Sequence, residues 1–144
     1  NNALTERRAE AQYVTLAAMS WDAHTRKLTI ANAGGLPPII CRGDVLLDLN
    51  AEGVPVGLLQ ARVYDEMSAD LQAGDLVVLT SDGILDALNE AGEEYGRERL
   101  GAAIRACCDQ PVADIVKSLY AAVEAFVGET PQFDDQTVLI LRVS

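Results

Sequence analysis

The stretch at residues 76–86 reads LVVLTSDGILD, an apolar run that ends in an acidic residue and a glycine. Four large apolar residues follow the turn signal AGD at residues 73–75, which predicts a strand buried on both faces. Gly83 is expected to permit a backbone turn after this strand, because it carries no side chain. Asp82 would then stand at the end of a rigid element, where metal ligands and catalytic carboxylates are often built. An Asp-Gly pair after a strand is also an ordinary turn, so this stretch alone leaves both interpretations open.

A second acidic pair precedes the last apolar run of the chain. Asp134 and Asp135 come directly before QTVLILRV at residues 136–143, a β-type run. If this strand is an antiparallel neighbour of the strand before Asp82, then Asp82 and Asp134 lie at the same end of one sheet. Two neighbouring carboxylates repel each other unless a cation or a shared proton compensates, and hard oxygen ligands suit Mg²⁺ or Mn²⁺. For Asp135, a solvated acidic turn is the favoured interpretation.

In this order, the two motifs resemble the last two signature motifs of the PPM-type, metal-dependent protein serine/threonine phosphatases. They are TSDGILD at residues 80–86 and DDQTV at residues 134–138. The branch that the chain resembles most is the bacterial stage II sporulation protein E-like group, which also includes stress-response sigma-factor regulators. Further stretches that match this branch are YVTL at 13–16, LTIANAG at 28–34, PP at 37–38, GLL at 57–59, LQAGD at 71–75 and EEYG at 93–96.

The resemblance implies a fold and a metal site. The fold is α+β, a PPM-phosphatase-like sandwich of mostly antiparallel sheets flanked by helices, with the metal site at one end. By resemblance, Asp82 and Asp134 are ligands of two Mg²⁺ or Mn²⁺ ions, and no residue beyond the metal ligands is catalytic. Asp86 and Asp135 are candidates for carboxylates that surround these ligands. A helix-capping or solvated role explains Asp86 equally well.

The resemblance also implies a function in bacterial signalling. The family hydrolyses phosphoserine and phosphothreonine with water that the paired metals activate, so no covalent enzyme intermediate is needed. The expected partner is a phosphorylated regulatory protein such as an anti-sigma-factor antagonist. The alternative is an inactive phosphatase-like interaction module that keeps the fold without the chemistry.

Two positions depart from the family pattern. The first metal motif of the family, an Asp-containing segment with Gly-His-Gly, normally lies upstream of a helix leading into the strand at Val14. The chain begins at Asn1, so we expect residues 1–144 to form one domain that is incomplete at its N-terminus. Alone, it should bind Mg²⁺ or Mn²⁺ weakly, show little phosphatase activity and tend to self-associate through unpaired sheet edges. Gly35 stands where the family usually has a histidine that is not a metal ligand.

Composition narrows the class of partner. The chain has 22 acidic and 11 basic residues and a net charge of -11, which argues against nucleic acid or an anionic membrane as partner. No apolar run approaches the roughly 18–20 residues needed to span a bilayer. Three cysteines, two of them adjacent at Cys107 and Cys108, make no disulfide framework and favour a reducing, cytoplasmic setting. The only histidine, His24, is expected to be a solvated turn residue.

Periodicity and turn signals predict the remaining elements. The expected helices are residues 3–12 (partial), 98–107 and 111–127, and the expected strands are residues 13–21, 27–32, 39–41, 45–47, 63–71, 76–81 and 133–143. Strands dominate the first half, followed by two helices and a last strand, which is typical of an α+β fold.

Overall fold

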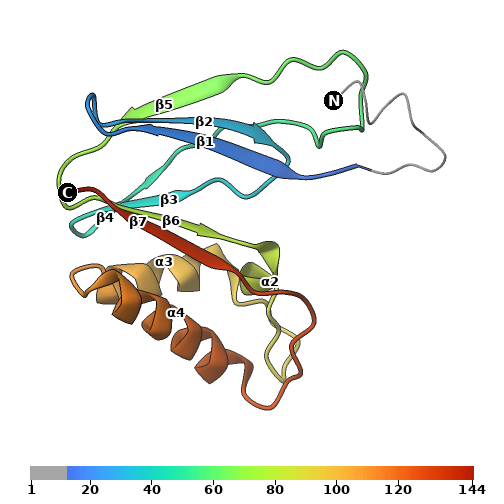
Figure 1. The fold of residues 1–144 in the computed structure, drawn as a ribbon. Coiled ribbons are helices and arrows are strands. Elements are labelled where there is room, and N and C mark those ends of the chain that lie inside the picture. The colour runs from blue at the N-terminus through green and yellow to red at the C-terminus, as the bar shows by residue number, and fades with distance from the viewer. Residues whose placement is uncertain (1–12) are drawn as a thin grey trace. The chain divides into compact units, whose positions relative to one another are not determined.

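The structure is a computed structural model that describes residues 13–144, drawn as a ribbon in Figure 1. The helix predicted at residues 3–12 lies outside the described residues. Within them, no helix is long and apolar enough to cross a membrane. That residues 1–144 form a single domain stays a prediction.

The described chain divides into two compact units. The first, called here the three-stranded unit, comprises residues 13–37 and Leu49–Leu71 and holds β1 (Leu16–Asp22), β2 (Lys27–Ala33) and β5 (Glu66–Asp70). The second, called here the helical unit, comprises Pro38–Asp48 and Gln72–Ser144. Its strands are β3 (Ile39–Arg42), β4 (Val45–Asp48), β6 (Leu76–Thr80) and β7 (Val138–Arg142), and its helices are α2 (Asp82–Leu85), α3 (Gly96–Cys107) and α4 (Val112–Val127).

The three-stranded unit is an antiparallel sheet in the order β1-β2-β5. The pairing of β1 with β2 confirms the first predicted hairpin. Asp22 closes its turn, because the carboxylate accepts hydrogen bonds from the backbone N–H groups of His24 (2.8 Å) and Thr25 (3.3 Å). His24 is exposed in this turn, as the sequence predicts.

The sheet of the helical unit is antiparallel as well, in the order β4-β3-β6-β7. β6 is an inner strand that pairs with β3 on one side and β7 on the other. Leu76, Val77 and Val78 are each 1% exposed. Because successive residues of a strand point to opposite faces, β6 is buried on both faces, as its apolar run predicts.

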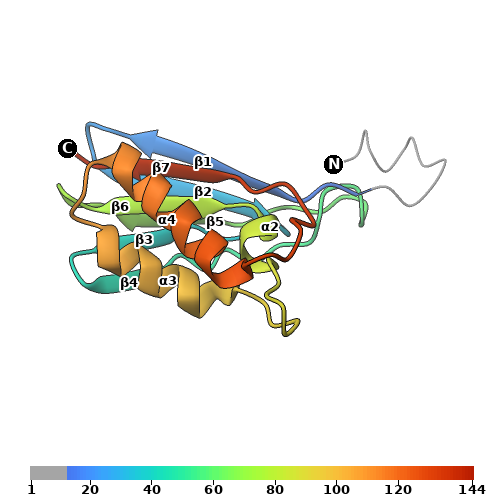
Figure 2. The same cartoon turned by 90° about the horizontal axis from the view of Figure 1, so that it is seen from below.

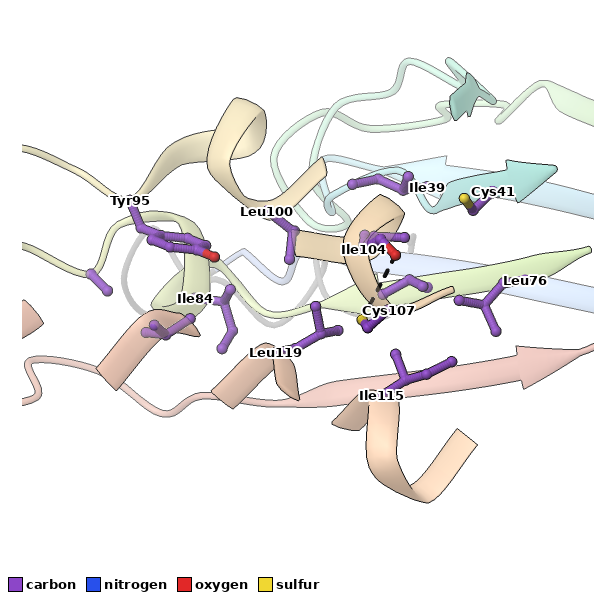
Figure 3. Close-up of a cluster of buried hydrophobic side chains, with 13 residues drawn as sticks. Ile39, Cys41, Leu76, Ile84, Tyr95, Leu100, Ile104, Cys107, Ile115 and Leu119 are labelled. Carbon is purple, nitrogen blue, oxygen red and sulfur yellow. Dashed lines mark hydrogen bonds between the residues drawn. The ribbon is translucent and has the colours of Figure 1, made fainter. Parts of the chain in front are cut away.

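Helices α3 and α4 lie side by side on one face of this sheet (Figures 1 and 2). Both confirm predicted helices. Their apolar faces meet the sheet in one aliphatic core, shown in Figure 3. Removing a buried aliphatic side chain from such a core typically costs about 2–5 kcal/mol. The most deeply buried members of the core are Leu76, Val78, Ile84, Leu100, Ile104, Ile115 and Leu119.

Several element ends differ from the sequence prediction. β7 begins at Val138 rather than at residue 133, because the preceding residues form a loop that bonds to the end of β6. β5 begins only at Glu66, where its pairing with Ala31 of β2 starts. Pro111 precedes the first residue of α4, and Gly128 ends this helix with φ +59°, a conformation that favours glycine.

A buried ion pair fastens the start of β6. The carboxylate of Asp75, which is 2% exposed, accepts hydrogen bonds from Arg42 Nε (2.9 Å) and Nη2 (2.6 Å) and from the backbone N–H of Gln72 (2.8 Å). Burial alone would raise the pKa of this carboxyl. The bonds from Arg42 and Gln72 outweigh burial, so the pKa lies below its ordinary value. Asp75 therefore locks the β3–β4 hairpin to the inner strand.

Candidate metal centre

The site predicted from the sequence lies where β6 and β7 leave the sheet. These strands are antiparallel neighbours, paired from Leu76↔Arg142 to Thr80↔Val138. One residue further on, the backbone N–H of Ser81 still donates to the carbonyl of Thr137 (3.0 Å). Asp82 follows β6 and Asp134 precedes β7, so both residues lie at the same end of this strand pair. The sequence argument rested on this antiparallel pairing, and the structure confirms the pairing.

Ser81 joins the two acidic segments, a role that the sequence did not predict. Its hydroxyl donates to the carbonyl of Asp135 (2.8 Å) and accepts from the backbone N–H of Thr137 (2.9 Å). Ser81 also occupies the N-cap position of α2, but its side chain makes no capping bond to that helix. A serine before a helix is usually assigned to capping, so only the long-range contact shows what this hydroxyl does.

Gly83 has a different role from the one expected. It is buried inside α2 and does not form a turn with the left-handed backbone that favours glycine. A Cβ atom at this position would lie 2.4 Å from the carbonyl oxygen of Asp135 and 3.3 Å from the carbonyl carbon of Asp134. Gly83 is therefore required because the backbone of the second acidic segment passes directly against it.

Both predicted ligands present exposed carboxylates. Asp82 Oδ1 accepts the backbone N–H of Gly83 (3.0 Å), and Asp134 Oδ1 accepts the backbone N–H of Asp135 (2.7 Å). Among residues 13–144, the ion pairs formed with Lys or Arg involve other carboxylates. Within the described residues, the two acidic segments thus meet at one end of the sheet without an ion pair to either carboxylate.

Asp86 lies one helical turn after Asp82. Its backbone N–H donates to the carbonyl of Asp82 (2.8 Å), which places it at the C-cap of α2, and its side chain is exposed. Asp86 and Asp134 both line a cavity of about 240 Å³ bounded by the last turns of α4 and the loop before β7. Phe133, also in the lining, is 94% exposed. Asp135 contributes its backbone carbonyl to the contact with Ser81, and its side chain is exposed.

The donor chemistry at this end of the sheet fits a hard divalent cation. Carboxylate oxygens suit Mg²⁺ and Mn²⁺, and Mg²⁺ is usually held by one or two carboxylates together with several waters. Asp82 and Asp134 supply such a pair on contacting segments. Within residues 13–144, however, no group of three or more His, Cys, Asp or Glu side chains is arranged to hold a metal ion. The described residues thus offer two carboxylates at this end of the sheet and no third side chain grouped with them as a ligand.

Comparison with a solved structure identifies the fold. The fold matches that of the phosphatase domain of the cell fate determinant SpoIIE from Bacillus subtilis, in crystals presoaked with Mn. The TM-score is 0.74 at 22% identity, over 97% of this chain and 61% of that one. Two antiparallel sheets with helices in this arrangement are the PPM phosphatase fold, which confirms the predicted fold class.

Sequence comparison places the chain within that class. The family model of Stage II sporulation protein E (SpoIIE) matches residues 1–144, so the chain belongs to this family of PPM-type phosphatases. It is 25% identical over 144 residues to Stage II sporulation protein E of Bacillus subtilis (strain 168), covering 99% of this chain and 17% of that protein. It is 26% identical over 144 residues to Phosphoserine phosphatase RsbU of the same organism, covering 98% of this chain and 42% of that protein. The chain therefore spans less than half the length of either relative.

Proposed function

We propose that this chain is part of a metal-dependent protein phosphatase domain that hydrolyses phosphoserine or phosphothreonine on a regulatory protein. The observation that carries the proposal is the contact between the Asp82 and Asp134 segments at one end of the β6–β7 pair. Within residues 13–144, neither carboxylate forms an ion pair with Lys or Arg, so the two contacting segments are a suitable place for Mg²⁺ or Mn²⁺.

Each residue of the site has a defined part in this proposal. Asp82 and Asp134 would supply negatively charged oxygens to the ion, and Ser81 holds their segments together through its two hydrogen bonds. Gly83 allows the segments to approach, since any side chain there would meet the backbone of Asp135. When bound, such a metal lowers the pKa of a water molecule and offsets charge on the transferring phosphoryl group.

The described nucleophilic side chains support a mechanism without a covalent intermediate. Cys41 and Cys107 are buried, and Cys41 pairs with Leu76, at the opposite end of β6 from Asp82. Cys108 is half-buried, and its thiol contacts the carbonyl of Gly43 near Cys41. His24 is exposed in a turn of the other unit and is the only histidine in the chain. Direct attack by water therefore agrees best with the residues available at the Asp82 end.

The names of the relatives support a proposal for the substrate class. RsbU is named a phosphoserine phosphatase, and the SpoIIE protein carries the family name. On that ground we propose a phosphoserine of a regulatory protein, such as an anti-sigma-factor antagonist, as the substrate.

A second candidate is a phosphatase-like interaction module without activity. The observation that favours it is the lack, within residues 13–144, of a third ligand near the two aspartates. Turnover by the full-length wild-type protein separates the two candidates, because an inactive module releases no phosphate at any Mn²⁺ concentration.

The test is phosphate release from a phosphoserine protein by the full-length protein with saturating Mn²⁺. Asp82→Asn and Asp134→Asn should each lower the rate at least about a hundredfold, because even residues that only support metal ligands cost about 10–100-fold when changed. Asp44→Asn, at an exposed position between β3 and β4, is the matched control and should keep the wild-type rate. Near-normal turnover by Asp82→Asn would rule out the proposed site.

A further inference from the structure

Two of the three cysteines contact the same backbone carbonyl at the end of the helical unit where β6 begins. Cys41 lies in β3 opposite Leu76, and Cys108 follows the last residue of α3. Both thiols contact the same acceptor, the carbonyl oxygen of Gly43, Cys41 Sγ at 3.2 Å and Cys108 Sγ at 3.6 Å. Two sulfur atoms that share one oxygen at these distances are themselves close neighbours.

A second observation supports this proximity. Burial raises the pKa of the Cys41 thiol to about 11, and the next largest contributions come from the charge and the hydrogen bond of Cys108. The charge of Cys108 also raises the pKa of the Cys107 thiol, but the hydrogen-bond contribution from Cys108 acts on Cys41 and not on Cys107. Cys107 differs, because its thiol lies in the core and bonds to the carbonyl of Ala103 (3.1 Å) within its own helix.

The backbone around Cys108 is held in place from the sheet. Arg142 of β7 donates through Nη2 to the carbonyl oxygens of Cys108 and Gln110. The shared contact of the two thiols with Gly43 is thus built from fixed elements, β3 on one side and the anchored end of α3 on the other. Disulfides need two Cβ atoms within a short, defined range, which rigid neighbouring elements can provide without rearrangement.

From this geometry we infer that Cys41 and Cys108 form a reversible disulfide when the protein meets a peroxide. Cys108 is half-buried and reacts first: its sulfur attacks one peroxide oxygen, the O–O bond breaks, and a sulfenic acid and water are formed. The Cys41 sulfur then attacks the Cys108 sulfur, the S–O bond breaks, and the thiol proton leaves with the oxygen as a second water. Two thiols and one hydrogen peroxide thereby give one disulfide and two waters.

The bond would tie the β3–β4 hairpin to the α3–α4 connection across 66 intervening residues. Cross-linking residues that far apart in sequence restricts the unfolded chain strongly. The disulfide would lie at the Leu76 end of β6, whereas Asp82 follows the other end of that strand. Its formation is therefore a separate event from metal binding at the proposed site.

The test is treatment of the full-length protein with hydrogen peroxide, followed by peptide mass spectrometry without reductant. We expect a peptide pair joined through Cys41 and Cys108, lighter by two hydrogen atoms than the separate peptides. The melting temperature should rise by roughly 5–10 °C and return after dithiothreitol.

Three variants make the result specific. Cys107→Ser is the matched control and should keep the bond, whereas Cys108→Ser and Cys41→Ser should lose it. If Cys41→Ser fails to fold, Cys108→Ser alone tests the inference, because Cys108 is only half-buried. A bond that involves Cys107, bonds only between molecules, or a Cys108 sulfinic acid beside an unmodified Cys41 would overturn the inference.

Discussion

The two ends of β6 each carry an aspartate, and their surroundings differ completely. Asp75, before the strand, is 2% exposed and bonded to Arg42 and Gln72. Asp82, after the strand, is exposed, and its carboxylate accepts one bond from the next backbone N–H. An acid whose charge is fully compensated stabilises the fold. An acid left without a cation, beside a second one on a contacting segment, is available to bind a ligand.

The largest effect on stability is expected at Asp75. Asp75→Asn should lower the free energy of unfolding by about 2–3 kcal/mol, because it removes the charge of the buried carboxylate that pairs with the Arg42 guanidinium. The loss is smaller than for a fully buried pair, since the Arg42 side chain is 33% exposed. Urea unfolding of this variant beside Asp44→Asn measures the difference. Equal midpoints for the two variants would show that the buried pair contributes nothing.

Gly83→Ala should be the next most damaging change. Its methyl group would meet the carbonyl oxygen of Asp135 at 2.4 Å, so the loop before β7 must move away. We expect a loss of about 1–3 kcal/mol in unfolding free energy, as for other overpacked sites. Gly53→Ala is a second variant of the same kind, because a Cβ atom there would also meet backbone atoms. Gly74→Ala is not a suitable control, because its φ of +93° strains any side chain. Wild-type stability of Gly83→Ala would mean that the two acidic segments do not touch.

Lowering the pH should selectively reduce the contribution of Asp75 to the free energy of unfolding. The pKa of Asp75 is lowered in the folded protein, so its contribution is complete above the ordinary pKa of about 4. The contribution is lost as the pH falls from there through the lowered value. Urea midpoints between pH 6 and pH 3, compared between wild type and Asp75→Asn, should converge at the acid end. A constant difference across this range would contradict the assignment.

The smallest effect is expected at Asp82. Asp82→Asn should change the unfolding free energy of the metal-free protein by no more than about 0.5 kcal/mol, as is usual for exposed sites. Relief of repulsion from Asp134 could make the change slightly stabilising. Thermal unfolding in the presence of a chelator measures it. A loss comparable to that of Asp75→Asn would show that Asp82 is a structural acid like Asp75.

The sequence predicted the strands that carry the two aspartates. It did not predict the contacts that make Asp75 a buried, paired acid and leave Asp82 exposed. The apolar runs before Asp82 and after Asp135 were sufficient to predict β6 and β7, whereas their antiparallel pairing was an assumption that the structure confirms. Asp75 was interpreted only as part of a turn signal, because Arg42 lies 33 residues away and no local pattern connects them.

The same limit applies to Ser81 and Gly83. The local pattern suggested a turn at Gly83 and no role for Ser81, whereas both residues act on a segment more than fifty positions later in the chain. The helices at residues 98–107 and 111–127 were predicted well, because their apolar periodicity is itself local. Which carboxylates hold a metal stays a prediction, since the side chains of Asp82 and Asp134 are exposed and the chain offers no third ligand within residues 13–144.

Isothermal titration with Mn²⁺ tests the central claim, that the Asp82 end of β6 holds a divalent metal and the Asp75 end does not. In the full-length protein, Asp82→Asn and Asp134→Asn should each weaken Mn²⁺ binding at least about tenfold, whereas Asp44→Asn should leave it unchanged. The 144-residue chain alone should bind Mn²⁺ weakly, since residues 13–144 offer two carboxylates at this site and no third ligand grouped with them. Binding that is equally tight in wild type, Asp82→Asn and Asp134→Asn would contradict the claim and place the metal elsewhere.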